Sequence, residues 1–201
     1  MNKKLPELLS PAGSFEALRA AIDGGADAIY MGGASFNARI NAKNFGENEM
    51  REAVKLAHAY GVKLYQTVNT MVLDRETDEL LRAAESSARA GIDAFIVSDL
   101  GVASLLHSYL PDMPLHASTQ MSIHSSKGAN LLSEYGFTRV VPARELSREN
   151  ILSLVQNSSL EVEIFIHGAL CVSHSGQCLF SSLVGGRSGN RGLCAQPCRL
   201  P

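Results

Sequence analysis

The residues best suited to chemistry lie together near the end of this 201-residue sequence. The segment EIFIHGALCVSHSGQCLF (163–180) ends an apolar run and contains Glu163, His167, Cys171, His174 and Cys178. Cys194 and Cys198 follow within GLCAQPCRLP, and these four cysteines are the only ones in the sequence. Four thiolates satisfy tetrahedral Zn²⁺ or an iron–sulfur cluster, since both select soft sulfur ligands. The grouping therefore predicts a metal or cluster site.

The cysteine spacing is Cys171-x6-Cys178-x15-Cys194-x3-Cys198. Neither pair has the C-x2-C knuckle that zinc ribbons use, so the spacing favours an iron–sulfur cluster over structural zinc. Two other interpretations stay open. In the first, the cysteines are ordinary small core residues. In the second, Cys171 is a nucleophile whose pKa is lowered by the flanking His167 and His174.

The linker LVGGRSGNRGLC joins the two cysteine pairs and is rich in glycine, which permits close backbone approach. Its Arg187 and Arg191 are suited to binding phosphate or carboxylate groups bidentately. The alternative is a flexible surface loop that wraps a metal site. The formal net charge is −2, but the part from Glu163 onward carries three arginines against one carboxylate. That part is therefore locally positive.

These residues need elements that position them, and the sequence alternates short apolar strands with amphipathic helices. We expect strands within 6–12, 27–33, 62–70, 93–99, 114–120, 138–145 and 161–169, and helices at 14–25, 46–61 and 76–91. Such alternation predicts parallel strands joined by crossover helices. G-x-G-x-x-G is absent after the first strand, which argues against a dinucleotide-binding sheet.

The strand faces favour a TIM-barrel-like (β/α) barrel with a polar interior. Period-two alternation places Glu163, Phe165 and His167 on one face, and His116, Ser118 and Gln120 on another, with His167 at the carboxyl mouth. Seven strand–helix units are present and an eighth is missing, so we expect a truncated or partner-completed barrel. We expect residues 1–170 to form the barrel and residues 171–201 a cysteine-rich, cluster-binding segment on its carboxyl face.

Composition is that of an ordinary globular protein, with 45% hydrophobic residues. No signal-peptide-like or membrane-spanning apolar segment is evident, so we expect a cytoplasmic protein in which thiols stay reduced.

The cysteine segment closely resembles the signature of peptidase family U32, the collagenase-like proteins. The matching pattern is Glu163-x-Phe165-x-x-Gly168-Ala169-Leu170-Cys171, four residues, Gly176-x-Cys178, and Ser181. Phe180 departs from it, because a smaller aliphatic residue is usual there. The segments ELLSPAGSFEALRAAIDGGADAIYMGG and LHASTQMSIHS are similar to that family as well.

The resemblance implies hydroxylation, since members of the family are associated with hydroxylating a tRNA uridine, an rRNA cytidine or the ubiquinone ring. The ubiquinone members carry a four-cysteine 4Fe–4S cluster, which implies that Cys171, Cys178, Cys194 and Cys198 are cluster ligands here. An RNA substrate, tRNA or rRNA, would present an unstacked base. Arg187, Arg191 and Arg39 would then hold phosphates, and Glu163, His167, His116 and Gln120 would line the polar mouth as candidate catalytic groups.

Two alternatives to an RNA hydroxylase remain open at this point. One is a metal-dependent or cysteine-dependent peptidase acting on collagen or other unfolded chains. The other is a barrel with structural zinc that binds RNA or a partner protein.

Overall fold

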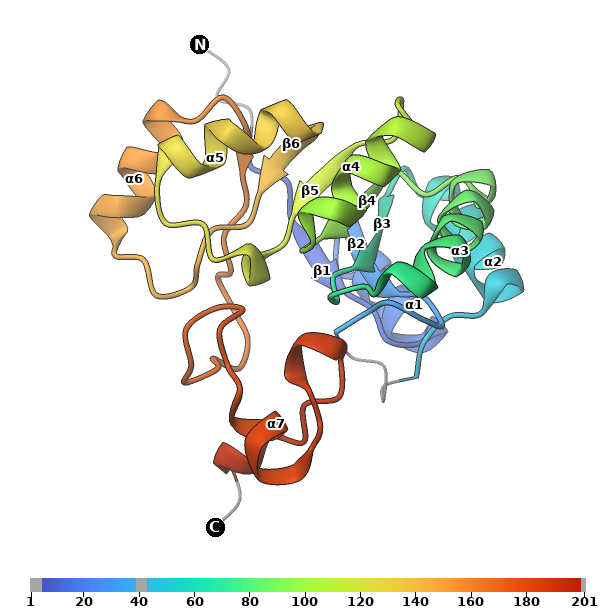
Figure 1. The fold of residues 1–201 in the computed structure, drawn as a ribbon. Coiled ribbons are helices and arrows are strands. Elements are labelled where there is room, and N and C mark those ends of the chain that lie inside the picture. Colours follow the sequence, from blue (N-terminus) through green and yellow to red (C-terminus); the bar gives the residue numbers. More distant parts are fainter. Residues whose placement is uncertain (1–4, 39–42, 200–201) are drawn as a thin grey trace.

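A computed structural model of the protein describes residues 5–38 and 43–199. It contains one sheet of seven parallel strands in the order β1-β2-β3-β4-β5-β6-β7, so each strand pairs with the next along the chain. The sheet curls into a half-barrel, and the predicted TIM-barrel-like architecture with seven strand units is confirmed (Figure 1).

The strands are β1 (Leu9–Pro11), β2 (Ala28–Gly32), β3 (Lys63–Val68), β4 (Ala94–Val97), β5 (Leu115–Ala117), β6 (Phe137–Val140) and β7 (Glu161–Val162). The α-helices are α1 (Phe15–Asp23), α2 (Glu47–Ala59), α3 (Thr77–Ala90), α4 (Leu100–Tyr109), α5 (Ser126–Leu132), α6 (Arg148–Asn157) and α7 (Phe180–Gly185). Short 3-10 turns are η1 (Asp74–Glu76), η2 (Thr119–Met121), η3 (Ser133–Tyr135), η4 (Gly189–Arg191) and η5 (Pro197–Arg199).

The helix ends follow from local sequence chemistry. The hydroxyl of Ser14 accepts from Ala17 N–H at 3.2 Å to start α1, and Asp99 caps α4 in the same way. Gly91 ends α3 with φ of 97°, a left-handed conformation that glycine adopts without strain. The three helices predicted from periodicity are therefore present within a few residues of their expected bounds.

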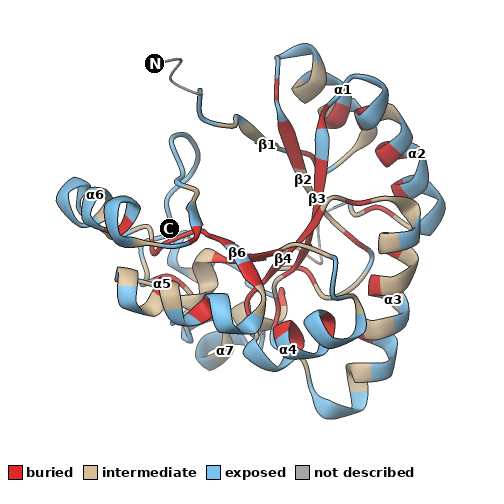
Figure 2. Cartoon of the chain, turned by 90° about the horizontal axis from the view of Figure 1, so that it is seen from above, coloured by how far each residue is buried: buried red, intermediate tan, exposed pale blue. Residues whose placement is uncertain are grey.

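Two apolar layers hold the barrel together. The larger lies between the outer face of the sheet and the surrounding helices and includes Leu18, Leu64, Phe95, Leu106 and Leu115, each fully buried. A smaller cluster lies on the inner face and contains Ala28, Tyr65, Ala94 and Ile96. Figure 2 shows the buried strands inside an arc of helices. The apolar outer face was predicted, and the inner face is the more polar of the two.

The seventh strand is much shorter than predicted. β7 ends at Val162, and the next apolar residues are exposed: Ile164 by 47%, Phe165 by 51% and Ile166 by 79%. The neighbouring strand β6 ends at Val140, and the last ladder contact is Glu163 N–H to Val140 carbonyl at 3.0 Å. Beyond that contact the chain has no strand to pair with, so the alternating faces expected for 161–169 do not form.

The fifth strand was also predicted too long. β5 ends at Ala117, and Gln120 lies in η2 rather than on the inner strand face with His116. Within the described part of the chain, none of the helices has the length and hydrophobicity of a bilayer-spanning segment.

Candidate functional site

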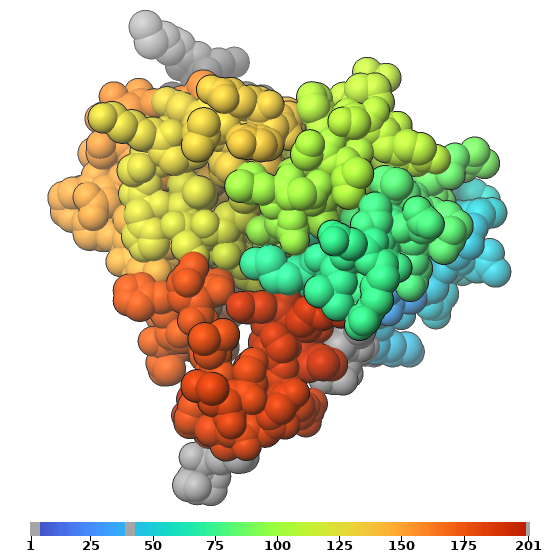
Figure 3. Space-filling view, viewed as in Figure 1, coloured from blue at the N-terminus to red at the C-terminus, as the bar shows by residue number. Residues whose placement is uncertain are grey.

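The segment from residue 163 to residue 199 forms a lobe at one end of the barrel (Figure 3). Ser175 attaches it to the loops that follow β5 and β6. The Ser175 hydroxyl donates to Glu145 Oε2 at 2.9 Å and accepts from the backbone N–H of Arg144 at 3.2 Å. Ser175 is fully buried, and the Ser122 hydroxyl donates to its carbonyl. The cysteine motif is therefore attached through the residues between its two cysteines.

Gly176 makes this attachment sterically possible. Its φ is 74°, and a Cβ at this position would lie 1.9 Å from the carbonyl oxygen of Gln120. Only glycine fits so close to that backbone. The structure thus assigns a packing contact to the backbone of Gln120, a residue that the sequence placed among the polar groups of the mouth.

The glycine-rich linker docks on the opposite side of the same barrel end. Arg191 forms a bidentate ion pair with Glu76 at 2.6 and 2.7 Å and also donates to the Met71 carbonyl at 2.8 Å. These hydrogen bonds lower the pKa of Glu76 to about 2. A Cβ on Gly192 would lie 2.4 Å from the Asn37 carbonyl. A phosphate would have to displace Glu76 to reach Arg191.

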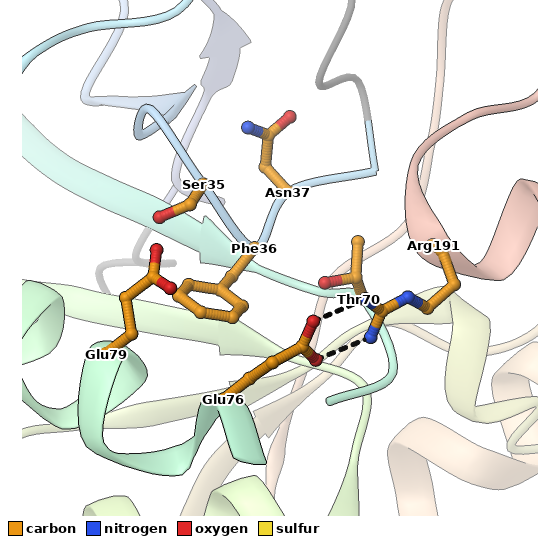
Figure 4. Close-up of a pocket in the computed structure, with 7 residues that line it drawn as sticks. All are labelled: Ser35, Phe36, Asn37, Thr70, Glu76, Glu79 and Arg191. Atoms are coloured by element: carbon orange, nitrogen blue, oxygen red, sulfur yellow. Dashed lines mark hydrogen bonds and ion pairs between the residues drawn. The ribbon is translucent and has the colours of Figure 1, made fainter. Parts of the chain in front are cut away.

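The Glu76–Arg191 pair lies at the edge of a pocket of about 140 Å³. The pocket is lined by Ser35, Phe36, Asn37, Thr70, Glu76, Glu79 and Arg191, which come from the loops after β2 and β3, from α3 and from the linker (Figure 4). Phe36 has φ of 59°, unusual for a bulky residue. With two carboxylates and one already paired cation, the pocket is not suited to a phosphate.

All four cysteines are free thiols, with Cys171, Cys194 and Cys198 exposed and Cys178 partly buried. Hydrogen bonds between their neighbours tie the segment together. Arg199 donates to the Leu170 carbonyl at 2.8 Å, which links the residue after Cys198 to the one before Cys171. The Ser181 hydroxyl accepts from Ala195 N–H at 3.0 Å, which links the region of Cys178 to that of Cys194.

Among the described residues, no three cysteine sulfurs lie within 4.8 Å of one another. Ligands of a single ion need such proximity, whereas each thiolate of a 4Fe–4S cluster binds a different iron and stands farther from the others. Four thiols in one cross-linked segment are a donor set that fits either a cluster or a zinc ion.

A cluster of polar side chains lies on the inner face of the barrel and is distinct from the cysteine segment. The His116 ring meets Tyr65 edge to face at 4.7 Å between centroids, and Arg139 lies 5.4 Å from the Tyr65 ring centroid. His116 is 4% exposed and its Nδ1 has no hydrogen-bond partner. Burial, with the nearby positive charge of Arg139, lowers the pKa of His116 to about 3. This histidine is neutral at pH 7.

Arg139 links the first strand to the last across the open side of the half-barrel. It pairs with Glu7, just before β1, at 2.7 Å and with Glu161 of β7 at 2.7 Å. Glu163 lies farther away, 3.5 Å from Arg139, and its burial raises the pKa of its carboxyl group. Burial also opposes ionisation of Glu7, but hydrogen bonds from Arg139, Tyr65 and Lys63 more than offset it and lower the pKa of Glu7.

The structure thus brings together two of the four predicted catalytic residues. Glu163 and His116 share the inner face near Arg139. His167 lies in an exposed bend outside any strand, because β7 has already ended. Arg187 is exposed and makes no ion pair with any described residue. The predicted phosphate ligand Arg39 lies outside the described residues.

Several residues of the two sites were missed by sequence reasoning. Arg139 faces inward, and the available signal was a charged residue inside the apolar run TRVV. Glu145 and Glu76 follow strands or precede helices, where no pattern distinguishes a docking carboxylate from a solvated one.

Comparison with known proteins identifies the family. The model of peptidase family U32 matches residues 13–201. This chain belongs to peptidase family U32. The U32 segment with the cysteines is the part that the loops after β2, β3, β5 and β6 hold in place. A solved structure of the U32 peptidase Mk0906 has the same fold, with a TM-score of 0.64 and 14% identity over 82% of this chain and 70% of that one.

Two curated U32 relatives carry more informative names. The 23S rRNA 5-hydroxycytidine C2501 synthase of Escherichia coli (strain K12) is 46% identical over 97% of this chain and 29% of its own length. The tRNA hydroxylation protein P1 of Bacillus subtilis (strain 168) is 38% identical over 98% of this chain and 46% of its own length. The chain thus spans less than half the length of these U32 proteins.

Proposed function

We propose that this chain takes part in hydroxylating a base of ribosomal or transfer RNA. The observation that carries the proposal is its 46% identity, over nearly its whole length, to a protein named for making 5-hydroxycytidine in 23S rRNA. A second relative, at 38% identity, is named for tRNA hydroxylation. Such a substrate would place the protein in the cytoplasm.

We further propose that Cys171, Cys178, Cys194 and Cys198 hold a 4Fe–4S cluster. Support comes from four free thiols in one segment and from the hydrogen bonds that cross-link their neighbours. A bound cluster supplies one-electron chemistry that side chains lack. The chain itself holds the segment over the barrel end, through Ser175 on one side and Arg191 on the other. Structural zinc is the alternative, and iron and sulfide analysis of protein purified without oxygen separates the two.

An RNA base must leave its stack to reach a reactive centre. Arg187 is exposed and is the arginine of the linker best suited to a phosphate, and Arg39 remains a second candidate from the sequence. We assign His167, exposed in the bend before Cys171, to proton transfer at the substrate. Glu163 and the neutral His116 would shape the inner wall.

A second proposal concerns the open edge of the sheet. Ile164, Phe165 and Ile166 are exposed directly after β7. We propose that an eighth strand, from a second subunit or from another part of a longer protein, covers them. Unpaired strand edges with apolar neighbours are normally covered in folded proteins.

Peptidase activity is the alternative that the family name raises. Ser175 lies beside both a histidine and a carboxylate, His174 and Glu145. It is fully buried, and its hydroxyl donates to Glu145 rather than to a histidine. A substrate cannot reach it, so this arrangement does not support a serine nucleophile.

The proposal is tested in the organism that encodes the chain. Deleting the gene removes one hydroxylated nucleoside from total rRNA or tRNA, seen by mass spectrometry as the loss of one oxygen atom. An unchanged nucleoside profile in both RNA classes would overturn the proposal.

A further inference from the structure

A second group of metal-binding side chains lies apart from the cysteine thiols. His124, Glu145 and His174 each offer one donor atom, and the three atoms lie within 4.8 Å of one another. His124 follows β5 and η2, Glu145 follows β6, and His174 follows β7. The three therefore come from three consecutive strand ends, at the carboxyl end of the barrel, where barrel enzymes carry their functional groups.

The separations match the ligands of one ion. Glu145 Oε1 lies 3.3 Å from His124 Nε2 and 3.0 Å from His174 Nδ1. Ligands at about 2.1 Å from a common ion stand about 3.0 Å apart at right angles and about 3.4 Å apart in a tetrahedron. Both histidines approach the same carboxylate oxygen, so only small rotations separate this arrangement from a coordinated one.

The His124 ring is held in the tautomer that a metal requires. Its Nδ1 lies 2.7 Å from the Ser122 carbonyl, and a carbonyl only accepts, so Nδ1 carries the hydrogen. Nε2, the atom that a metal would bind, then faces the Glu145 carboxylate oxygen at 3.3 Å. A backbone carbonyl on the second ring nitrogen is the usual outer contact of a metal-bound histidine.

Hydrogen bonds also hold the Glu145 carboxylate in place. Glu145 Oε2 accepts from the buried Ser175 hydroxyl at 2.9 Å, and Oε1 accepts from Ser175 N–H at 3.2 Å. Ser175 in turn is held by Arg144 and Thr119. The side chains of His124 and His174 are 47% and 77% exposed, so solvent or a substrate has access to the remaining coordination positions.

We propose that His124, Glu145 and His174 bind one divalent transition-metal ion. Two imidazoles and one carboxylate are a donor set for Zn²⁺ or Fe²⁺, with positions left open for water or a substrate atom. The ion joins the cysteine motif to the loops after β5 and β6, and it is distinct from any group on the thiolates. The inference does not rest on RNA hydroxylation.

The experiment uses a variant in which all four cysteines are serine, so that thiolates cannot bind the probe. Co²⁺ and Zn²⁺ are titrated by absorption spectroscopy and calorimetry, and Fe²⁺ is titrated without oxygen to distinguish the two metals. We expect one ion per chain and no thiolate charge-transfer band. His124→Ala, Glu145→Gln and His174→Ala should each weaken binding by more than about 100-fold.

The matched control is His58→Ala. His58 pairs with Asp93 at 2.9 Å, a histidine–carboxylate contact without a second histidine, and its loss should leave binding unchanged. If the serine variant does not fold, histidine NMR of the wild-type chain with its thiols blocked by alkylation replaces it. One equivalent of Zn²⁺ should then shift the His124 and His174 signals and leave His58 in place. No stoichiometric binding, or equal effects in the control, would show that the three residues form only a hydrogen-bonded docking contact.

Discussion

Arg139 is the most connected charged residue of the inner face. It is 10% exposed, pairs with Glu7 and Glu161, and approaches Glu163. Three carboxylates around one guanidinium leave it well compensated, whereas its removal leaves Glu163 without a cation and Glu7 with only the partly exposed Lys63. A buried ion pair is most costly when one partner is lost.

Arg139→Ala should lower the free energy of unfolding by about 3 kcal/mol. Arg89→Ala is the control, because Arg89 is 77% exposed and pairs with Glu85 one helical turn away. Its loss should cost less than about 0.5 kcal/mol. Urea unfolding of both variants measures the difference, and equal losses would mean that the inner network does not join β1 to β7.

His116 should remain neutral in acid. Its pKa is lowered to about 3, so it takes no proton in the folded state between its ordinary value near 6.5 and that value. The unfolded chain does take a proton in that range. Burial of neutral His116 therefore leaves the free energy of unfolding unchanged above about pH 6.5 and lowers it progressively as the pH falls toward 3. Histidine NMR should show no His116 titration from about pH 8 to about pH 5. A midpoint near 6.5 would contradict its burial beside Arg139.

Element lengths show where sequence reasoning succeeds and where it stops. The helices at 14–25, 46–61 and 76–91 were found because caps and an apolar stripe lie within each one. β7 was overextended because its length depends on where β6 ends, a property of another segment. His167 was predicted on the inner face of that strand, and because β7 ends at Val162 it lies in an exposed bend instead.

Gly176 decides whether the cysteine motif docks. Gly176→Ala adds a Cβ 1.9 Å from the Gln120 carbonyl, so we expect the segment to detach and the chain to lose more than about 2 kcal/mol. Gly186→Ala is the control: its φ of 64° is similar, but no atom lies within 4 Å of the added carbon. The control should cost about 1 kcal/mol of backbone strain. Thermal unfolding measures stability, and protease cleavage between 163 and 179 measures detachment; similar cleavage of both variants would argue against the docking role.

At the scale of the whole molecule, the segment after β7 spans the barrel end. Ser175 and Gly176 hold it on the loops after β5 and β6, and Arg191 and Gly192 hold it on the loops after β2 and β3. The four cysteines are distributed along this span. The barrel therefore serves as a rigid base for a segment with little regular structure of its own.

The cysteines could be proposed as ligands from the sequence because thiol chemistry is set by residue type, and the barrel could be predicted because strand–helix alternation is a local pattern. The sequence was silent on His124 and Glu145, which meet His174 only after three strands pair side by side. Arg191 illustrates the same limit, since its partner Glu76 is 115 residues away.

The most direct measurement is the nucleoside composition of RNA from a deletion strain that carries a plasmid copy of the gene. Wild-type and Gly186→Ala chains should restore the hydroxylated nucleoside, and Cys178→Ser should not, at equal protein level. That result would tie the cysteine segment to RNA hydroxylation. Full restoration by Cys178→Ser would contradict the account, because the reaction would then proceed without an intact set of four thiolates.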